Sequence, residues 1–132
     1  MAAEHPKKVM LLDDERFLLG IYKISFERRG FEAVTFSDPD GALDALRQGY
    51  QPDVILFDIT LPQGRSGYEF IETVKRESLA KHALKIVLSN EGRDGARMRL
   101  EELGADEHLL KAQYVPAELV QKVQELLAKK RR

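Results

Sequence analysis

The chain has 132 residues, a length that suits one globular domain, and 43% of these residues are hydrophobic while 33% are charged. Its 21 basic residues are balanced by 22 acidic ones, so no overall positive charge attracts nucleic acid or an anionic membrane. The absence of cysteine excludes disulfides, thiolate metal sites and cysteine nucleophiles. No apolar stretch approaches the roughly 20 residues that cross a bilayer, and residues 1–8 contain no signal-peptide core. We therefore expect one cytoplasmic domain over residues 1–132, with a core over about residues 8–128.

Five short apolar segments lie along the chain, and each of them predicts a β-strand. In chain order these segments cover residues 9–12, 31–36, 54–57, 86–88 and 107–110. The first, third and fourth are uninterrupted apolar runs, which are typical of strands buried on both faces of a sheet.

The segments that follow these strands carry apolar residues at helical spacing and predict five helices. In chain order the helices cover about residues 15–29, a segment from Pro39, a segment after Gly67, residues 92–103 and a segment from Pro116. In the first helix, Phe17, Ile21 and Ile24 form the stripe that we expect to face the sheet. Gly30 and Gly104 predict the ends of the first and fourth helices.

Strict alternation of strands and helices predicts right-handed crossovers and a parallel sheet with helices on both faces. The expected fold is therefore a three-layer, doubly wound α/β fold of five strand–helix units, which is flavodoxin-like. We assume the strand order 2-1-3-4-5, in which the order reverses between the first and third strands.

Polar residues follow four of the predicted strands. Asp13 and Asp14 follow the first strand, Asp58 the third, Ser89 the fourth and Lys111 the fifth. Because ligands of open α/β sheets bind beyond the carboxyl ends of the strands, we expect these residues at one edge of the sheet. By themselves, the two adjacent aspartates would also suit a turn that caps the first helix.

Three carboxylates in one cleft repel one another unless a cation joins them. Their oxygen ligands suit Mg²⁺, which binds one or two carboxylates together with waters and phosphate oxygens. Lys111 supplies an ammonium and Ser89 a hydroxyl, and both groups suit the charge on phosphoryl oxygens. Carboxylates can accept a phosphoryl group covalently, and Asp58 occupies the central position.

Four segments carry a resemblance to a known family: VMLLDDE, VILFDITLP, IVLSN and GADEHLLK. They resemble the motifs of bacterial response-regulator receiver domains, and the similarity extends from Lys8 to about Ala128. The resemblance implies the following site residues: Asp58 as phosphoacceptor, Asp14 as a direct Mg²⁺ ligand, Asp13 as a ligand acting mainly through water, the backbone carbonyl of Thr60 as a further ligand, Ser89 as the switch hydroxyl and Lys111 as the phosphoryl-binding cation.

The resemblance also implies a function in a two-component phosphorelay. A sensor histidine kinase or phosphotransfer protein would phosphorylate Asp58 in a Mg²⁺-dependent reaction. The change would be read by a downstream protein, which the sequence does not identify, at the surface formed by the fourth helix, fifth strand and fifth helix. Such a domain is not an enzyme beyond its own phosphoryl transfer and dephosphorylation. We expect a monomer or a phosphorylation-dependent dimer, with neither nucleic acid nor membrane as a partner.

The sequence departs from the family pattern at three places. Ala112 replaces the proline that commonly follows the lysine, which predicts either a trans bond with a rearranged loop or a strained cis bond. The loop 61–67 is one residue longer than usual. His108 stands where the family usually has Tyr or Phe, and it is either a switch residue that couples signalling to pH or a partly exposed edge-strand histidine.

Other functions remain as alternatives. A receiver-like docking module would signal without phosphorylation. A Mg²⁺-dependent phosphohydrolase with an aspartyl-phosphate intermediate needs a second acid two residues after its nucleophile, and that position holds Thr60. A dinucleotide-binding domain needs a glycine-rich turn after the first strand, but the turn here reads Asp-Asp-Glu-Arg.

Overall fold

The computed structural model describes residues 6–61, 66–90 and 99–130. Its strands are β1 (Lys8–Leu12), β2 (Glu32–Phe36), β3 (Val54–Phe57), β4 (Leu84–Ser89) and β5 (Glu107–Leu110). Its helices are α1 (Arg16–Glu27), α2 (Pro39–Arg47), α3 (Gly67–Arg76), α5 (Pro116–Lys130) and the short 3₁₀ helix η2 (Lys111–Gln113). Residues 99–102 are also helical, whereas residues 92–98 of the predicted fourth helix lie outside the described part.

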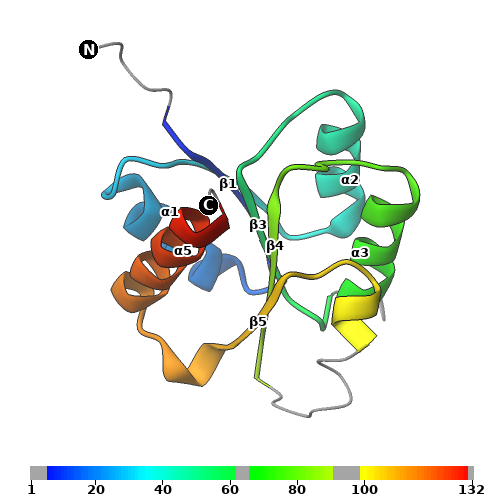
Figure 1. Cartoon of the computed structure of the whole chain (residues 1–132). Coiled ribbons are helices and arrows are strands. Elements are labelled where there is room, and N and C mark those ends of the chain that lie inside the picture. The colour runs from blue at the N-terminus through cyan, green and yellow to red at the C-terminus, as the bar shows by residue number, and fades with distance from the viewer. Residues whose placement is uncertain (1–5, 62–65, 91–98, 131–132) are drawn as a thin grey trace.

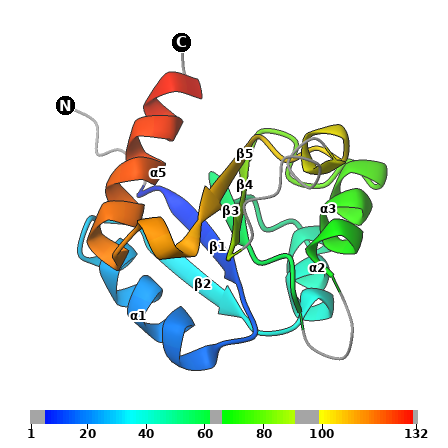
Figure 2. The same cartoon turned by 90° about the horizontal axis from the view of Figure 1, so that it is seen from below.

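All five strands are parallel and lie in the order β2-β1-β3-β4-β5. Figure 1 shows α1 and α5 on one face of the sheet and α2 and α3 on the other, and Figure 2 shows the same layers after rotation. The predicted three-layer, doubly wound α/β fold and its strand order are therefore confirmed. Among the described residues, no helix has both the length and the apolar character needed to cross a membrane.

Two hydrophobic clusters pack against the two faces of the sheet. Val9 and Leu11 of β1 belong to the cluster under α1 and α5, while Met10 and Leu12 belong to the cluster under α2 and α3. This division follows from the strand geometry, because successive side chains point to opposite faces. Both faces are covered, which explains why the central strands read as uninterrupted apolar runs.

The prediction that Phe17, Ile21 and Ile24 form the buried stripe of α1 is wrong. Phe17 is 84% exposed and Ile24 is 52% exposed. The helix instead buries Leu19, Tyr22 and Phe26. Both sets of residues have helical spacing, so periodicity along α1 did not distinguish between them.

The buried stripe of α1 is selected by its contacts with the rest of the molecule. Phe26 is fully buried and meets Phe31 edge-on, with 5.0 Å between the ring centroids. The hydrophobic cluster on this face of the sheet also contains residues of β1, β2 and α5. The orientation of the helix is therefore set by tertiary packing.

Local signals set several of the helix boundaries. Gly30 and Gly104 have φ angles of +88° and +110°, a backbone conformation that favours glycine, so both predicted helix ends are confirmed. At the start of α2, the Asp38 side chain accepts a hydrogen bond from the Asp40 N–H, and Pro39 occupies the first helical position.

We expect Phe26→Ala to lower the free energy of unfolding by about 3–5 kcal/mol, because it removes a fully buried ring. Phe17→Ala should change it by less than about 0.5 kcal/mol, because the Phe17 ring is exposed. Urea denaturation of the two variants measures both values. A large loss for Phe17→Ala would contradict the orientation of α1 described above.

Candidate functional site

The carboxyl ends of β1 and β3 place two acidic side chains next to each other. The N–H of Asp13 donates to the Phe36 carbonyl of β2 at 3.1 Å, and the N–H of Asp58 donates to the Leu12 carbonyl of β1 at 3.0 Å. These bonds extend the ladder of the sheet by one residue beyond each strand. The backbone therefore fixes both aspartates where the strand order reverses.

Lys111 lies between these two acids. Its Nζ is 2.7 Å from Asp13 Oδ2 and 3.0 Å from Asp58 Oδ2, and all three side chains are largely buried. Lys111 begins η2 directly after β5, and no peptide bond in the described part is cis. Of the two outcomes predicted for the bond before Ala112, the trans bond is therefore the one found, and Lys111 still reaches Asp58.

Asp13, Asp14 and Asp58 each offer a carboxylate oxygen, and these three oxygens lie within 4.8 Å of one another. Asp13 and Asp58 are buried, whereas Asp14 is exposed to solvent. An all-oxygen set with an open side fits Mg²⁺, which takes oxygen ligands and keeps several of its waters. The three acids therefore fit a divalent cation by their chemistry and their spacing.

Burial and charge shift the proton affinities of this cluster. Burial raises the pKa of the Asp58 carboxyl above its ordinary value; hydrogen bonding and charge attraction from Lys111 lower it, and the nearby Asp13 charge raises it further. For Lys111, burial alone lowers the pKa, but hydrogen bonds to Asp13 and Asp58 outweigh this and hold it above its ordinary value. Lys111 is therefore a permanent positive charge at this site.

A cavity of about 300 Å³ opens beside Asp58. Its lining residues come from the loops after β1, β3, β4 and β5: Asp14, Glu15, Asp58, Ile59, Thr60, Ser89, Asn90 and Lys111. The Thr60 N–H donates to Asp58 Oδ1 at 3.3 Å. The cavity therefore brings the predicted acceptor, hydroxyl and ammonium together beside the three clustered carboxylate oxygens.

Ser89 is buried, and its Oγ lies 2.8 Å from His108 Nε2. The register of the sheet explains this contact, because Ser89 pairs with Leu110 and His108 pairs with Val87. Ser89 and His108 are therefore diagonal neighbours on the same face of the sheet. The structure thus joins the two predicted switch residues directly.

Gly67 supports the site, although sequence analysis assigned it no such role. It begins α3, and its N–H donates to the Ile59 carbonyl at 2.6 Å. A Cβ atom at this position would collide with the backbone carbonyl of Asp58. Glycine is a poor helix former, so a glycine at the first helical position, directly after Ser66, indicates a requirement other than helix stability. This was the sequence signal for its role. Residues 62–65 of the longer loop lie outside the described part.

Comparisons with known proteins agree with this geometry. Residues 9–124 match the family model of the response regulator receiver domain. The chain is 32% identical over 121 residues to the phosphate regulon transcriptional regulatory protein PhoB of Escherichia coli, covering 92% of this chain and 52% of that protein. It therefore spans about half the length of the first curated relatives it matches.

Two other relatives match over most of their own length. The polar-differentiation response regulator DivK of Brucella anthropi is 29% identical over 111 residues, covering 84% of this chain and 89% of that protein. The structure of the chemotaxis response regulator CheY4 of Vibrio cholerae aligns with a TM-score of 0.81 at 26% identity, covering 92% of this chain and 98% of that one.

We expect Mg²⁺ to raise the free energy of unfolding of the protein, by about 2.7 kcal/mol at a concentration 100-fold above the dissociation constant. Asp14→Asn should reduce this increase strongly, because it removes one of the three clustered carboxylates. Asp44→Asn changes an exposed acid on α2 and should leave the increase intact. Denaturation with and without Mg²⁺ measures the effect, and equal responses of the two variants would contradict the metal assignment.

Proposed function

This chain belongs to the response regulator receiver domain family of two-component systems, and we propose that it is a phosphoryl-accepting switch whose acceptor is Asp58. One observation carries the proposal: the Asp58 carboxylate lines the cavity, and its Oδ2 lies 3.0 Å from the ammonium of Lys111. A nucleophile and a compensating cation therefore lie together beside a space of sufficient size for a phosphoryl group.

Asp58 suits the role of acceptor better than the other two acids. Asp13 contacts Lys111, as Asp58 does, but it does not line the cavity beside Asp58. Asp14 is exposed, which suits a ligand that exchanges a metal with solvent. Asp58 is also buried, and exclusion of water strengthens electrostatic interactions with a bound phosphoryl group.

In the proposed reaction, a carboxylate oxygen of Asp58 attacks the phosphorus of a phosphohistidine. The new O–P bond forms as the N–P bond breaks, and the electron pair of that bond returns to the imidazole. Lys111 is already placed at Asp58 Oδ2, so its ammonium would bind an oxygen of the incoming phosphoryl group. The N–H of Thr60 holds the other carboxylate oxygen and orients the acceptor.

Asp13, Asp14, Asp58 and the backbone carbonyl of Thr60 would hold the Mg²⁺ ion. When bound, the ion neutralises negative charge on the carboxylates and on the phosphoryl oxygens. Lys111, which contacts both Asp13 and Asp58, supplies positive charge at this site in addition to that of the bound ion.

Ser89 and His108 form the proposed switch. In this structure, Ser89 Oγ is hydrogen bonded to His108 Nε2. A phosphorylated Asp58 would offer oxygens to Ser89 across the same cavity and compete for it. The proposed readout surface combines the fourth helix, β5 and α5, and residues 92–98 of the predicted fourth helix lie outside the described part.

The surroundings of the site support a protein as the phosphoryl donor. A groove of about 290 Å³ adjoins Lys111 and runs between α1 and the segment after β5, where Leu18 and Tyr114 contribute to its walls. The exposed Phe17 lies on α1, the helix that forms one wall of the groove. We propose that the donor is a histidine kinase or a phosphotransfer protein.

We propose that the downstream partner is also a protein and that the domain acts in the cytoplasm. We further propose that it is a monomer, or a dimer that forms only on phosphorylation.

We expect acetyl phosphate and Mg²⁺ to add one phosphoryl group to the protein, seen by mass spectrometry of the intact chain. Asp58→Asn should abolish the adduct, while Asp44→Asn, a change to an exposed acid on α2, should retain it. Lys111→Gln should slow adduct formation by roughly 100-fold, because it removes a charge aimed at the phosphoryl oxygens. A folded wild-type protein without any adduct would favour the docking module instead.

We expect His108→Phe to tighten binding of beryllofluoride, a phosphoryl analogue, by roughly fivefold. The substitution removes the hydrogen bond that engages Ser89, and such a bond contributes about 1 kcal/mol. Titration followed by NMR measures the affinity. In a Ser89→Ala background the gain should vanish; an unchanged gain in that background would show that His108 acts independently of Ser89.

A further inference from the structure

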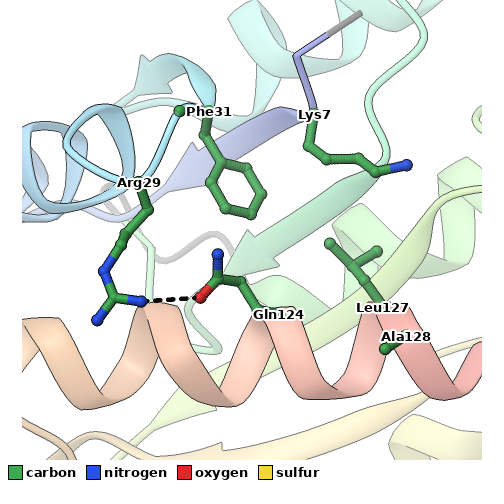
Figure 3. A pocket seen from close by; sticks show the side chains of 7 residues that line it. Lys7, Arg29, Phe31, Gln124, Leu127 and Ala128 are labelled. Carbon is green, nitrogen blue, oxygen red and sulfur yellow. Dashed lines mark hydrogen bonds between the residues drawn. The ribbon is translucent and has the colours of Figure 1, made fainter. Parts of the chain in front are cut away.

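A second cavity lies far from the acidic cluster, at the opposite end of β1. It encloses about 220 Å³ between the start of the sheet, the end of α1 and the second half of α5. The side chains that line it are those of Lys7, Arg29, Phe31, Gln124, Leu127 and Ala128, as Figure 3 shows. The site described above does not use these residues.

The polar side chains of this cavity present hydrogen-bond donors. Arg29 Nη1 donates to Gln124 Oε1 at 3.2 Å, so the one acceptor atom among the lining side chains is already engaged. The amide nitrogen of Gln124 points toward the Phe31 ring in Figure 3. Lys7 and Arg29 add two positive charges to the lining. The lining side chains therefore present ammonium, guanidinium and amide donors to a ligand.

The two cations of the lining, Lys7 and Arg29, form no ion pair with the part of the chain that the structure describes. Within residues 6–61, 66–90 and 99–130, no carboxylate oxygen lies within 4.0 Å of the Lys7 ammonium or the Arg29 guanidinium. Arg29 uses one of its five N–H groups on a neutral amide. A guanidinium with free N–H groups binds a carboxylate well, because the two carboxylate oxygens can accept hydrogen bonds from two of its N–H groups side by side.

The rest of the lining is apolar. Phe31 presents its ring, and Leu127 and Ala128 present methyl groups on the facing side of α5. A cavity of 150 Å³ lined by apolar side chains holds one benzene ring, so 220 Å³ suits a single ring with a short substituent. The shape and the donors together describe a ligand that has an apolar ring and one anionic group.

We propose that this cavity binds small aromatic monocarboxylates, with the ring against Phe31 and Leu127 and the carboxylate on Arg29. Lys7 adds charge attraction. The loop before α1 and the start of α5 lie beside Lys111, whereas the end of α1 and the second half of α5 line this cavity, so the two sites lie at opposite ends of the same helix pair. Binding at this cavity requires neither Asp58 nor its phosphorylation.

Phenylacetate is the probe that tests the proposal. Titration into the ¹⁵N-labelled protein should shift the amide signals of Gly30, Phe31 and Ala128, with saturation near a dissociation constant of roughly 1 mM for a ligand of about ten heavy atoms. Phenylacetamide, which is neutral, and acetate, which has no ring, should each bind roughly tenfold more weakly.

Matched variants complete the test. Arg29→Gln should weaken phenylacetate binding by roughly tenfold, while Arg28→Gln, a change at the neighbouring exposed arginine outside the cavity, should leave it unchanged. Ala128→Trp should block binding by filling the cavity, and Asp58→Asn should have no effect on it. Equal binding of phenylacetamide, equal losses for Arg28→Gln and Arg29→Gln, or shifts that do not saturate at these amides would overturn the proposal.

Discussion

Asp13 and Asp58 are buried side by side at the end of a hydrophobic sheet, and two negative charges placed in this way repel each other unless a positive charge lies between them. Lys111 supplies this charge, with its Nζ 2.7 Å from one acid and 3.0 Å from the other. Removing the lysine would leave two buried negative charges without compensation, which is more costly than losing an exposed ion pair. These two contacts link the end of β5 to the ends of β1 and β3.

The sheet is what delivers Lys111 to the acids. Ser89 of β4 pairs with Leu110 of β5, so the next residue of the chain emerges at the same edge as Asp58. The 3₁₀ turn of Lys111–Gln113 then carries the chain toward α5 through trans peptide bonds. A proline after the lysine is therefore not needed to hold the ammonium at the site. Gly67 has a matching role on the other side, because only a residue without Cβ fits against the Asp58 carbonyl.

The two faces of α1 differ in burial. Leu19, Tyr22 and Phe26 bind the helix to the sheet and to α5, whereas Phe17 and Ile24 face solvent. At its far end the same helix contributes Arg29 to a cavity lined by two cations. The molecule thus carries an anionic, metal-fitting site and a cationic, apolar site at opposite ends of one helix pair.

The sequence by itself determined the alternation of elements, the parallel sheet and the residues that reach its carboxyl edge. These depend on local patterns: apolar runs such as residues 54–57, helix ends at Gly30 and Gly104, and polar residues directly after strands. Tertiary structure decided which apolar stripe of α1 is buried, that Ser89 contacts His108, and that Gly67 packs on Asp58. Each of these is a contact between segments distant in the chain or a choice between two faces of equal periodicity. Only the packing of the whole fold distinguishes such cases. The residues of a single segment do not determine which of two helix faces is buried or which residues of a neighbouring strand they contact.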